Sequence, residues 1–324
     1  MMLSVLDQSP VIAGQSGAAA IADTMTLVES ADRWGYHRYW FSEHHGSASF
    51  ASASPLVMMA HAAARTTHIR LGSGGVLMGH ARPLEVAEAV RVLHALAPGR
   101  IDLGMGRAPG GDQRVMQALG YDPRTTPQRI REVLDHLADT CIASNDGRVV
   151  AVPDGVPAPE PWVLGTSPDS AQMAAALGLP YAAGAFIDPT QIETCLATYY
   201  QHFVPSRWCA APTTMLATVV FCADTEQDAR RIMHTSEQWF VQSFLRAENV
   251  RFPAGDHSIT LSARETMITE MRRSTVIWGT AQACVEQLQM LQKRLQVAEV
   301  AVVTITERFD DRLRSYELLA EALQ

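Results

Sequence analysis

The sequence predicts an α/β fold of the (β/α)8 barrel class. Strand-like and helix-like segments alternate along all 324 residues, and eight of these segments are strand-like, each with at least one helix after it. A doubly wound open sheet is the alternative, but it usually has fewer strands and often carries a dinucleotide-binding fingerprint. That fingerprint, Gly-x-Gly-x-x-Gly, is missing. Gly104-x-Gly106 is followed by Pro109 at the position of the third glycine, and Gly72-x-Gly74 is followed by Leu77.

The stretch 70–112 shows the alternation most clearly. An apolar run at 69–72 gives way to Ser73-Gly74-Gly75, and a helix is predicted over 83–96 because Pro83 suits the first helical position. Pro98-Gly99 ends that helix, and the next strand runs to Gly106-Arg107. Two strands joined by a helix are expected to be parallel, so their ends open at one mouth. The apolar positions expected on one face of this helix are Leu84, Ala87, Val90, Leu93 and Leu96.

The remaining elements follow the same logic. The predicted strands cover 3–6, 39–41, 69–72, 101–105, 162–164, 181–186, 215–222 and 300–305. The predicted helices cover 20–34, 55–64, 83–96, 112–119, 127–143, 168–177, 190–203, 225–247, 281–296 and 311–323. A short β-rich piece is expected at 148–152, before a proline-rich linker at 153–161. Residues 251–274 are polar and irregular, so we expect an insertion before the last strand of a single domain spanning 1–324.

Composition excludes several classes of function. The net charge is −8 and there is no basic block, which argues against nucleic-acid binding. No apolar stretch is long enough to span a membrane, and no signal peptide is recognisable at the N-terminus. The five cysteines form no Cys-x-x-Cys pair, so we expect a reduced, cytoplasmic protein without a zinc site. The only lysine, Lys293, lies in a predicted helix, which excludes a Walker-type phosphate loop.

Candidate chemistry lies where the predicted strands end, because the loops there build the sites of barrel enzymes. A metal site at Glu43-His44-His45 is disfavoured, since adjacent strand residues point to opposite faces. Taken alone, a histidine at position 44 is more often structural than catalytic, and Ser167 is a helix cap. Arg107 is expected to face the same mouth as Ser167, and an arginine beside a helix N-terminus suits a phosphate.

These residues resemble the bacterial luciferase-like flavin monooxygenases, most closely the single-chain, alkanal-monooxygenase-like subgroup. The matching segments are YHRYWFSEHH (36–45), RLGSGGVLMGHARPLEVAE (70–88), PGRIDLGMGRAPGGDQR (98–114), LGTSPDSAQMAAALGLPYA (164–182) and RLRSYELLAEAL (312–323). The resemblance implies a TIM-like barrel that binds reduced FMN, with His44 as the catalytic residue. The cofactor-binding residues that it implies are Gly74, Gly75, Arg107, Leu164, Thr166, Ser167 and Ser170.

The resemblance also carries finer expectations. The Gly74-Gly75 peptide matches a cis bond under the flavin ring, and 251–274 corresponds to a mobile active-site loop. Gly106 stands where luciferase has a reactive cysteine, which puts light emission in doubt. The implied reaction is oxygen addition at flavin C4a, and the resulting peroxide oxidises a small organic substrate such as an aldehyde or a secondary-metabolite intermediate. His44 would manage the protons.

The resemblance further implies two kinds of partner. A separate flavin reductase would supply the reduced FMN, and the protein would be a homodimer. No metal is expected. Two alternatives of the same fold stay open, a non-catalytic flavin-binding protein and a deazaflavin-dependent oxidoreductase.

Overall fold

The computed structural model describes residues 1–138, 149–255 and 258–324, and its centre is a closed barrel of parallel strands. Strand β10 pairs with both β1 and β8, which closes the ring β1-β2-β3-β5-β6-β7-β8-β10. The strands are β1 (Met2–Asp7), β2 (Arg38–Phe41), β3 (Arg70–Ser73), β5 (Ile101–Gly106), β6 (Glu160–Gly165), β7 (Tyr181–Gly184), β8 (Thr214–Cys222) and β10 (Glu299–Val303). The predicted (β/α)8 barrel is therefore confirmed, and an open doubly wound sheet is excluded.

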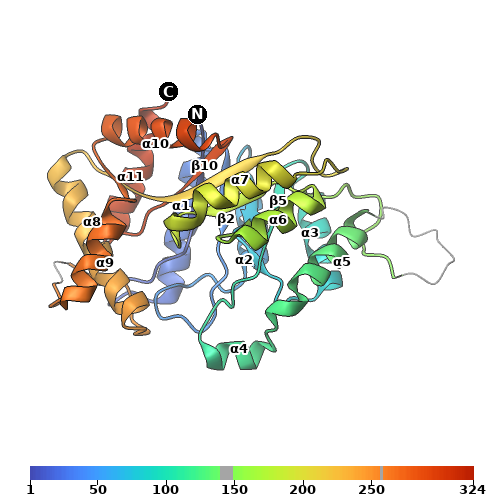
Figure 1. The fold of residues 1–324 in the computed structure, drawn as a ribbon, viewed down its shortest axis with the longest axis horizontal. Helices are drawn as coiled ribbons and strands as arrows, with labels where there is room; N and C mark the ends of the chain where they lie inside the picture. Colours follow the sequence, from blue (N-terminus) through green and yellow to red (C-terminus); the bar gives the residue numbers. More distant parts are fainter. Residues whose placement is uncertain (139–148, 256–257) are drawn as a thin grey trace.

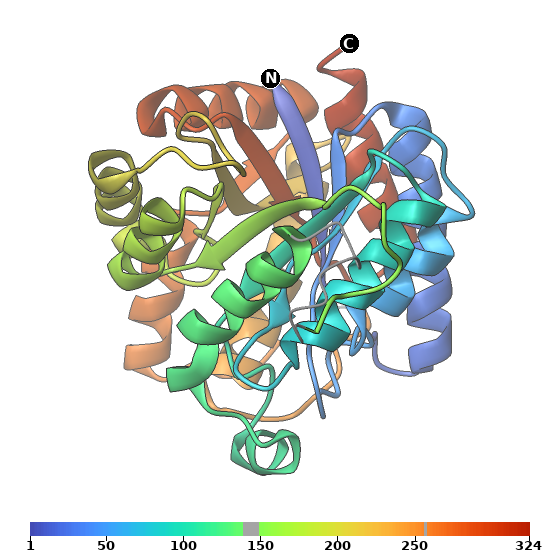
Figure 2. The same ribbon diagram turned by 90° about the vertical axis from the view of Figure 1, so that its right-hand side faces the viewer.

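Helices surround the barrel (Figure 1). They are α1 (Gly17–Trp34), α2 (Pro55–Ala63), α3 (Pro83–Leu96), α4 (Gln113–Leu119), α5 (Thr126–Ala138), α6 (Pro168–Leu177), α7 (Ile192–His202), α8 (Glu226–Phe240), α9 (Ala263–Arg273), α10 (Ala281–Leu295) and α11 (Phe309–Glu321). In Figures 1 and 2 both termini lie at one end of the barrel, and α4, which follows β5, projects beyond the other end. None of the described helices combines the length and the apolar character that crossing a membrane requires.

Of the three apolar cores in the described residues, the two largest hold these layers together. The larger core lies between strands and helices and takes in Tyr39, Leu71, Val90 and Tyr316. The smaller core fills the barrel interior, where Trp40 and Trp162 pack edge to face with ring centroids 5.4 Å apart. A barrel filled in this way is a solid support rather than a pore, so the site can lie only at its ends.

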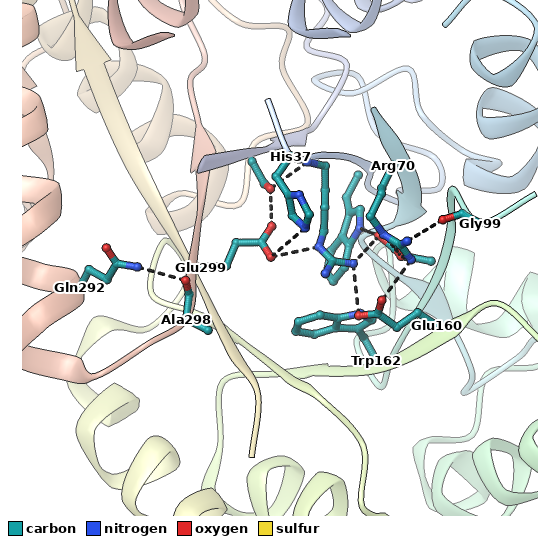
Figure 3. Close-up of polar contacts among 12 residues, drawn as sticks. His37, Arg70, Gly99, Glu160, Trp162, Gln292, Ala298 and Glu299 are labelled. Carbon is teal, nitrogen blue, oxygen red and sulfur yellow. Dashed lines mark hydrogen bonds and ion pairs between the residues drawn. The ribbon is translucent and has the colours of Figure 1, made fainter. Parts of the chain in front are cut away.

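A buried charge network occupies the N-terminal ends of the strands (Figure 3). Arg38 bonds Asp102 at 2.9 Å and Glu299 at 3.0 Å, and Arg70 also pairs with Asp102 and with Glu160. Burial alone would lower the pKa of Arg38, but the surrounding carboxylates raise it above its usual range. Because these residues come from five different strands, the network links the N-terminal ends of those strands.

The structure differs from the predicted elements in the insertion before the last strand. Residues 251–274 are not irregular throughout, since α9 occupies Ala263–Arg273 and begins with a capping box between Ser262 and Glu265. After α9, the unpredicted strand β9 (Ile277–Gly279) pairs with the upper half of β8. A second unpredicted strand, β4 (Val76–Leu77), pairs with β5.

The other differences are smaller. Leu96 was expected on the buried face of α3, but its side chain is 66% exposed. The helix predicted over 127–143 ends at Ala138, and its last five predicted positions lie outside the described residues. In place of the single helix predicted over 225–247, the α-helix ends at Phe240, and a π-helical turn, η3 (Val241–Leu245), follows it. The β-rich piece at 148–152 is not a strand over its described part, 149–152.

Candidate active site

A cavity of about 360 Å³ lies at the C-terminal ends of the strands. It opens between the ends of β2, β5, β6 and β7 and reaches down to Trp40 and Met215 in the barrel interior. Every site residue predicted from the sequence lines this one cavity: His44, Gly74, Gly75, Arg107, Leu164, Thr166, Ser167 and Ser170. The prediction that His44, Arg107 and Ser167 meet at one mouth is therefore confirmed.

The cavity floor is a glycine pair held close to its neighbours. The Gly74-Gly75 peptide bond is cis, as the family resemblance implied. A Cβ on Gly74 would lie 2.4 Å from Cδ1 of Leu6, and one on Gly75 would lie 2.9 Å from the carbonyl oxygen of Gly104. A larger residue at Gly75 would therefore strike fixed backbone, and one at Gly74 would force Leu6 to move, so the glycine pair keeps the floor flat enough for a planar ring to approach the backbone.

One end of the cavity has the chemistry of an anion site. Arg107 is exposed there, and no described residue forms an ion pair or hydrogen bond with its guanidinium. Across the mouth, Ser167 caps α6, and its hydroxyl accepts a hydrogen bond from the backbone N–H of Ser170. The hydroxyl of Ser170 lies 3.2 Å from that of Tyr181, which fixes it at the first turn. An unpaired arginine facing a helix N-terminus is the combination that binds phosphate.

His44 lies deeper in the cavity, just beyond the end of β2. A hydrogen bond of 3.1 Å joins its Nδ1 to the hydroxyl of Ser42, and its ring packs on Phe50 at 4.4 Å between centroids. No described residue lies within hydrogen-bond distance of its Nε2. Burial, with a smaller contribution from neighbouring His45, lowers the pKa of His44 to about 4. The ring is therefore neutral near pH 7 and presents one free nitrogen.

The neighbouring residues Glu43 and His45 turn the other way and meet His80. The Glu43 carboxylate lies 2.8 Å from Nε2 of His45 and 3.1 Å from Nε2 of His80. It also accepts a hydrogen bond from the backbone N–H of Leu77. The expectation that adjacent residues diverge was correct for His44, but Glu43 and His45 do converge, and no sequence pattern pointed to His80. Hydrogen bonds to one carboxylate account for the positions of both rings, which support the loop that carries His44.

A second, smaller chamber of about 180 Å³ lies next to the cavity and was not predicted. Gln8, His44, Phe186 and Ile187 line both spaces. We call this second space, with all the residues that line it, the aromatic chamber. Its other lining residues are Phe50, Val219, Phe221, Ser236, Trp239, Phe240, Phe244, Arg272, Val303 and Ile305. Arg272 comes from α9, the helix missing from the prediction, although the capping signal Ser262-x-x-Glu265 was readable.

Comparison with known proteins identifies the family. The family model for luciferase-like monooxygenases matches residues 1–296. The chain belongs to the luciferase-like monooxygenase family. The uncharacterized protein YwcH of Bacillus subtilis (strain 168) is 38% identical over 99% of this chain and 98% of its own. A luciferase-like monooxygenase of Escherichia coli (strain K12) is 33% identical over 97% of this chain and 95% of its own. The crystal structure of apo-MsnO8 superposes with a TM-score of 0.87 at 32% identity, over 99% of this chain and 98% of its own.

Proteins similar to this chain include ones named for two different cofactors. A trigonelline monooxygenase of Acinetobacter baylyi, 23% identical over 82% of this chain and 79% of its own, is named a flavin-dependent oxygenase component. A diketocamphane monooxygenase in complex with FMN has the same fold at a TM-score of 0.74 and 17% identity. An F420-dependent secondary alcohol dehydrogenase shares it at 0.70 and 11%. The luciferase-like fold is thus compatible with FMN and with the deazaflavin F420.

Gly106 has open space around it at the end of β5. It lines the cavity, and a Cβ built on it would have only Cδ2 of Leu77, at 3.8 Å, within 4 Å. The cavity therefore has room for a cysteine side chain at this position, and this chain leaves that space open.

Proposed function

We propose that this protein is a monooxygenase that uses reduced FMN and dioxygen to oxidise a small organic substrate. The observation that carries the proposal is the position of His44, a neutral histidine with a free Nε2 on the wall between two spaces. One space has the flat floor and anion site suited to FMN, and the other has apolar walls suited to an organic molecule.

The residues of the larger cavity fit FMN part by part. Gly74 and Gly75 would lie under the isoalloxazine ring, and Leu164 would cover part of its edge. The phosphate would lie between Arg107 and the start of α6, where Ser167, Ser170 and the backbone at Thr166 would contact it. A reaction on the bound flavin requires water to be excluded, and the buried floor and aromatic neighbours of His44 serve that purpose.

His44 is assigned the proton transfer. Bound reduced FMN supplies the activation of dioxygen, a chemistry that side chains do not provide. Nε2 of His44 would accept or return a proton at the reacting oxygen, while Ser42 holds Nδ1 and so fixes the ring orientation. With a pKa of about 4, His44 begins each cycle at neutral pH as a proton acceptor.

The proposal includes two partners. A separate reductase would deliver reduced FMN, because the chain lacks the glycine fingerprint with which many oxidoreductases bind NADH. The protein would be a homodimer joined through α2 and α3, where Val57 and Leu96 are 67% and 66% exposed. Large apolar side chains exposed on adjacent helices are typical of an interface.

The cofactor test compares FMN and F420 directly. Fluorescence and anaerobic absorbance titrations should show tighter binding of FMN, in the oxidised and the reduced state. Tighter binding of F420 would favour the deazaflavin-dependent oxidoreductase. Tight FMN binding with no product would favour the non-catalytic flavin protein.

The activity test uses NADH, FMN, a flavin reductase, a mixture of organic compounds and isotopically labelled dioxygen. Mass spectrometry should detect a product that carries one labelled oxygen atom. His44→Ala should retain FMN affinity and lower product formation by about a hundredfold or more, the usual scale for a lost general acid or base. Hydrogen peroxide should become the main fate of oxygen in that variant. The matched control is His202→Ala, which removes an exposed imidazole from α7.

A further inference from the structure

The aromatic chamber has almost entirely apolar walls, with a small number of polar groups among them. Phe50, Trp239 and Phe244 form connected edge-to-face contacts, with ring centroids 5.4 to 5.5 Å apart. Trp239 has its indole nitrogen bonded to the hydroxyl of Ser49 at 3.1 Å, so that polar group is satisfied. Surfaces of this kind take apolar or aromatic groups, and orientation must come from the few polar groups present.

Three polar side chains of the chamber have no partner. Gln8 and Ser236 are 5% and 3% exposed, yet neither side chain makes a hydrogen bond to any described residue. The guanidinium of Arg272 forms no hydrogen bond and no ion pair within the described residues. Buried polar groups in native proteins are normally hydrogen-bonded. Two buried groups and a partly buried guanidinium in one chamber, all without hydrogen-bond partners among the described residues, therefore indicate a ligand that would bond to them.

Arg272 and the next residue, Arg273, have different partners. Arg273 donates two hydrogen bonds of 2.7 Å to the carboxylate of Glu237, which therefore has both oxygens engaged. The guanidinium of Arg272 instead stacks on Phe240, with its central carbon 4.2 Å from the ring centroid. Burial lowers the pKa of Arg272 to about 10, and the more distant Glu237 compensates only in part. A cation held in this way gains most from a carboxylate brought to it.

The chamber's size and position limit what that carboxylate belongs to. Its volume of about 180 Å³ is close to that of an apolar cavity that takes a single benzene molecule, about 150 Å³. It adjoins the larger cavity through Gln8, His44, Phe186 and Ile187. A molecule whose acid group reached Arg272 could therefore present its other end at His44.

From this arrangement we propose that the aromatic chamber binds an organic carboxylate, with its acid group on Arg272 and its apolar body against Phe50 and Trp239. The body has about the size of one aromatic ring or a short alkyl chain. The hydroxyl of Ser236 and the amide of Gln8 supply further hydrogen bonds. The assignment of this molecule as the substrate rests on the proposed monooxygenase function, whereas the acid-binding site itself does not.

The test compares each acid with its uncharged amide of the same shape. Phenylacetate and phenylacetamide, and then hexanoate and hexanamide, are titrated calorimetrically into the protein at fixed ionic strength, with and without saturating oxidised FMN. The wild-type protein should bind the acids about tenfold or more tightly than the amides, the scale of a charge-assisted hydrogen bond.

Arg272→Gln should abolish this preference and leave FMN affinity unchanged. Arg264→Gln is the matched control, because it removes the same charge from an exposed position of α9 that does not line the chamber. Arg272→Lys keeps the charge without the planar fork, so it should retain part of the preference and covers the case in which the glutamine variant folds poorly.

Three results would overturn the proposal. They are equal binding of acid and amide by the wild-type protein, no binding of either acid at millimolar concentration, and an acid preference that survives in folded Arg272→Gln. FMN binding is measured on the same samples. Loss of FMN binding with a retained acid preference would count against the monooxygenase function and leave the carboxylate site standing.

Discussion

The protonation state of His44 is the most direct physical test of the candidate site. The ring is half-buried against Phe50, and its pKa is lowered from 6.5 to about 4 by burial and by His45. In the unfolded chain the same histidine would titrate near 6.5. We therefore expect His44 to stay neutral at pH values where an ordinary histidine is already half protonated.

The size and sign of the effect follow from proton linkage. Above pH 6.5 the imidazole is neutral in both states and contributes nothing to the pH dependence of stability. Between pH 6.5 and pH 4 the unfolded chain takes up a proton that folded His44 refuses, so the folded state loses stability as the pH falls. The loss amounts to about 1.4 kcal/mol at pH 5.5 and about 2 kcal/mol at pH 5, both upper limits for a ring partly exposed to solvent.

His44→Gln provides the comparison, because it removes the titrating ring at similar size. In proton NMR titrations, the imidazole resonance that disappears in this variant should not shift between pH 8 and pH 5. The urea midpoint of the wild-type protein should also fall more steeply than that of the variant as the pH drops from 6.5 to 5. A His44 resonance that titrates near pH 6.5 would refute the reasoning, and with it the assignment of His44 as a neutral proton acceptor.

The other predictions concern the cofactor, the barrel, the assembly and the insertion. Arg107→Ala should weaken FMN binding by about 2–3 kcal/mol in a fluorescence titration, and Ser167→Ala by less because backbone donors remain. Asp102→Asn should lower the free energy of unfolding by about 3–5 kcal/mol in urea, since it leaves two arginines of the network under-compensated. Leu96→Arg should convert a dimer to a monomer in light scattering; a wild-type monomer at micromolar concentration would contradict this. In hydrogen exchange, α9 should exchange before β5, because Thr269 is its only fully buried residue.

The sequence was sufficient to predict the barrel and the cavity, because both follow from patterns of neighbouring residues along the chain. A β-rich run that ends in glycine, serine or arginine marks a strand and its loop within a few residues. The rule that parallel strands end at one mouth then brings distant loops together. Arg107 and Ser167 lie 60 positions apart in the sequence, yet each could be assigned to that mouth from its own neighbourhood.

What the sequence did not reveal depends on long-range contacts. Arg38, Asp102 and Glu299 appear as ordinary surface charges until the strands place them in one buried network. Leu96 fits the apolar face of α3 by spacing, but the buried part of that face ends at Leu93. Helix α9 was missed because most of its residues are polar, so the few apolar ones gave too short a pattern to predict a helix, and only its capping box marked its start.

The same division separates the two halves of the site. Most residues that line the larger cavity belong to positions 6–187, and only Met215, Ala217 and Ala301 come from later in the chain. The aromatic chamber draws nine of its fourteen lining residues from position 219 onward, including Arg272 of the insertion. A cofactor site built on barrel strands can stay fixed while an insertion changes the neighbouring chamber.

This separation has a testable consequence for specificity. Substitutions in α8 and α9 that face the chamber, such as Ser236→Ala or Arg272→Gln, should change which organic molecule binds and leave FMN affinity within about twofold, because neither side chain lines the larger cavity. Substitutions at the mouth, such as Arg107→Ala, should do the reverse. His44 is the link, since it lines both spaces, and it should be the position at which a substitution affects neither binding step and removes product formation. If FMN affinity fell in step with acid affinity across the chamber variants, the two spaces would be one site, and the assignment of separate roles would be wrong.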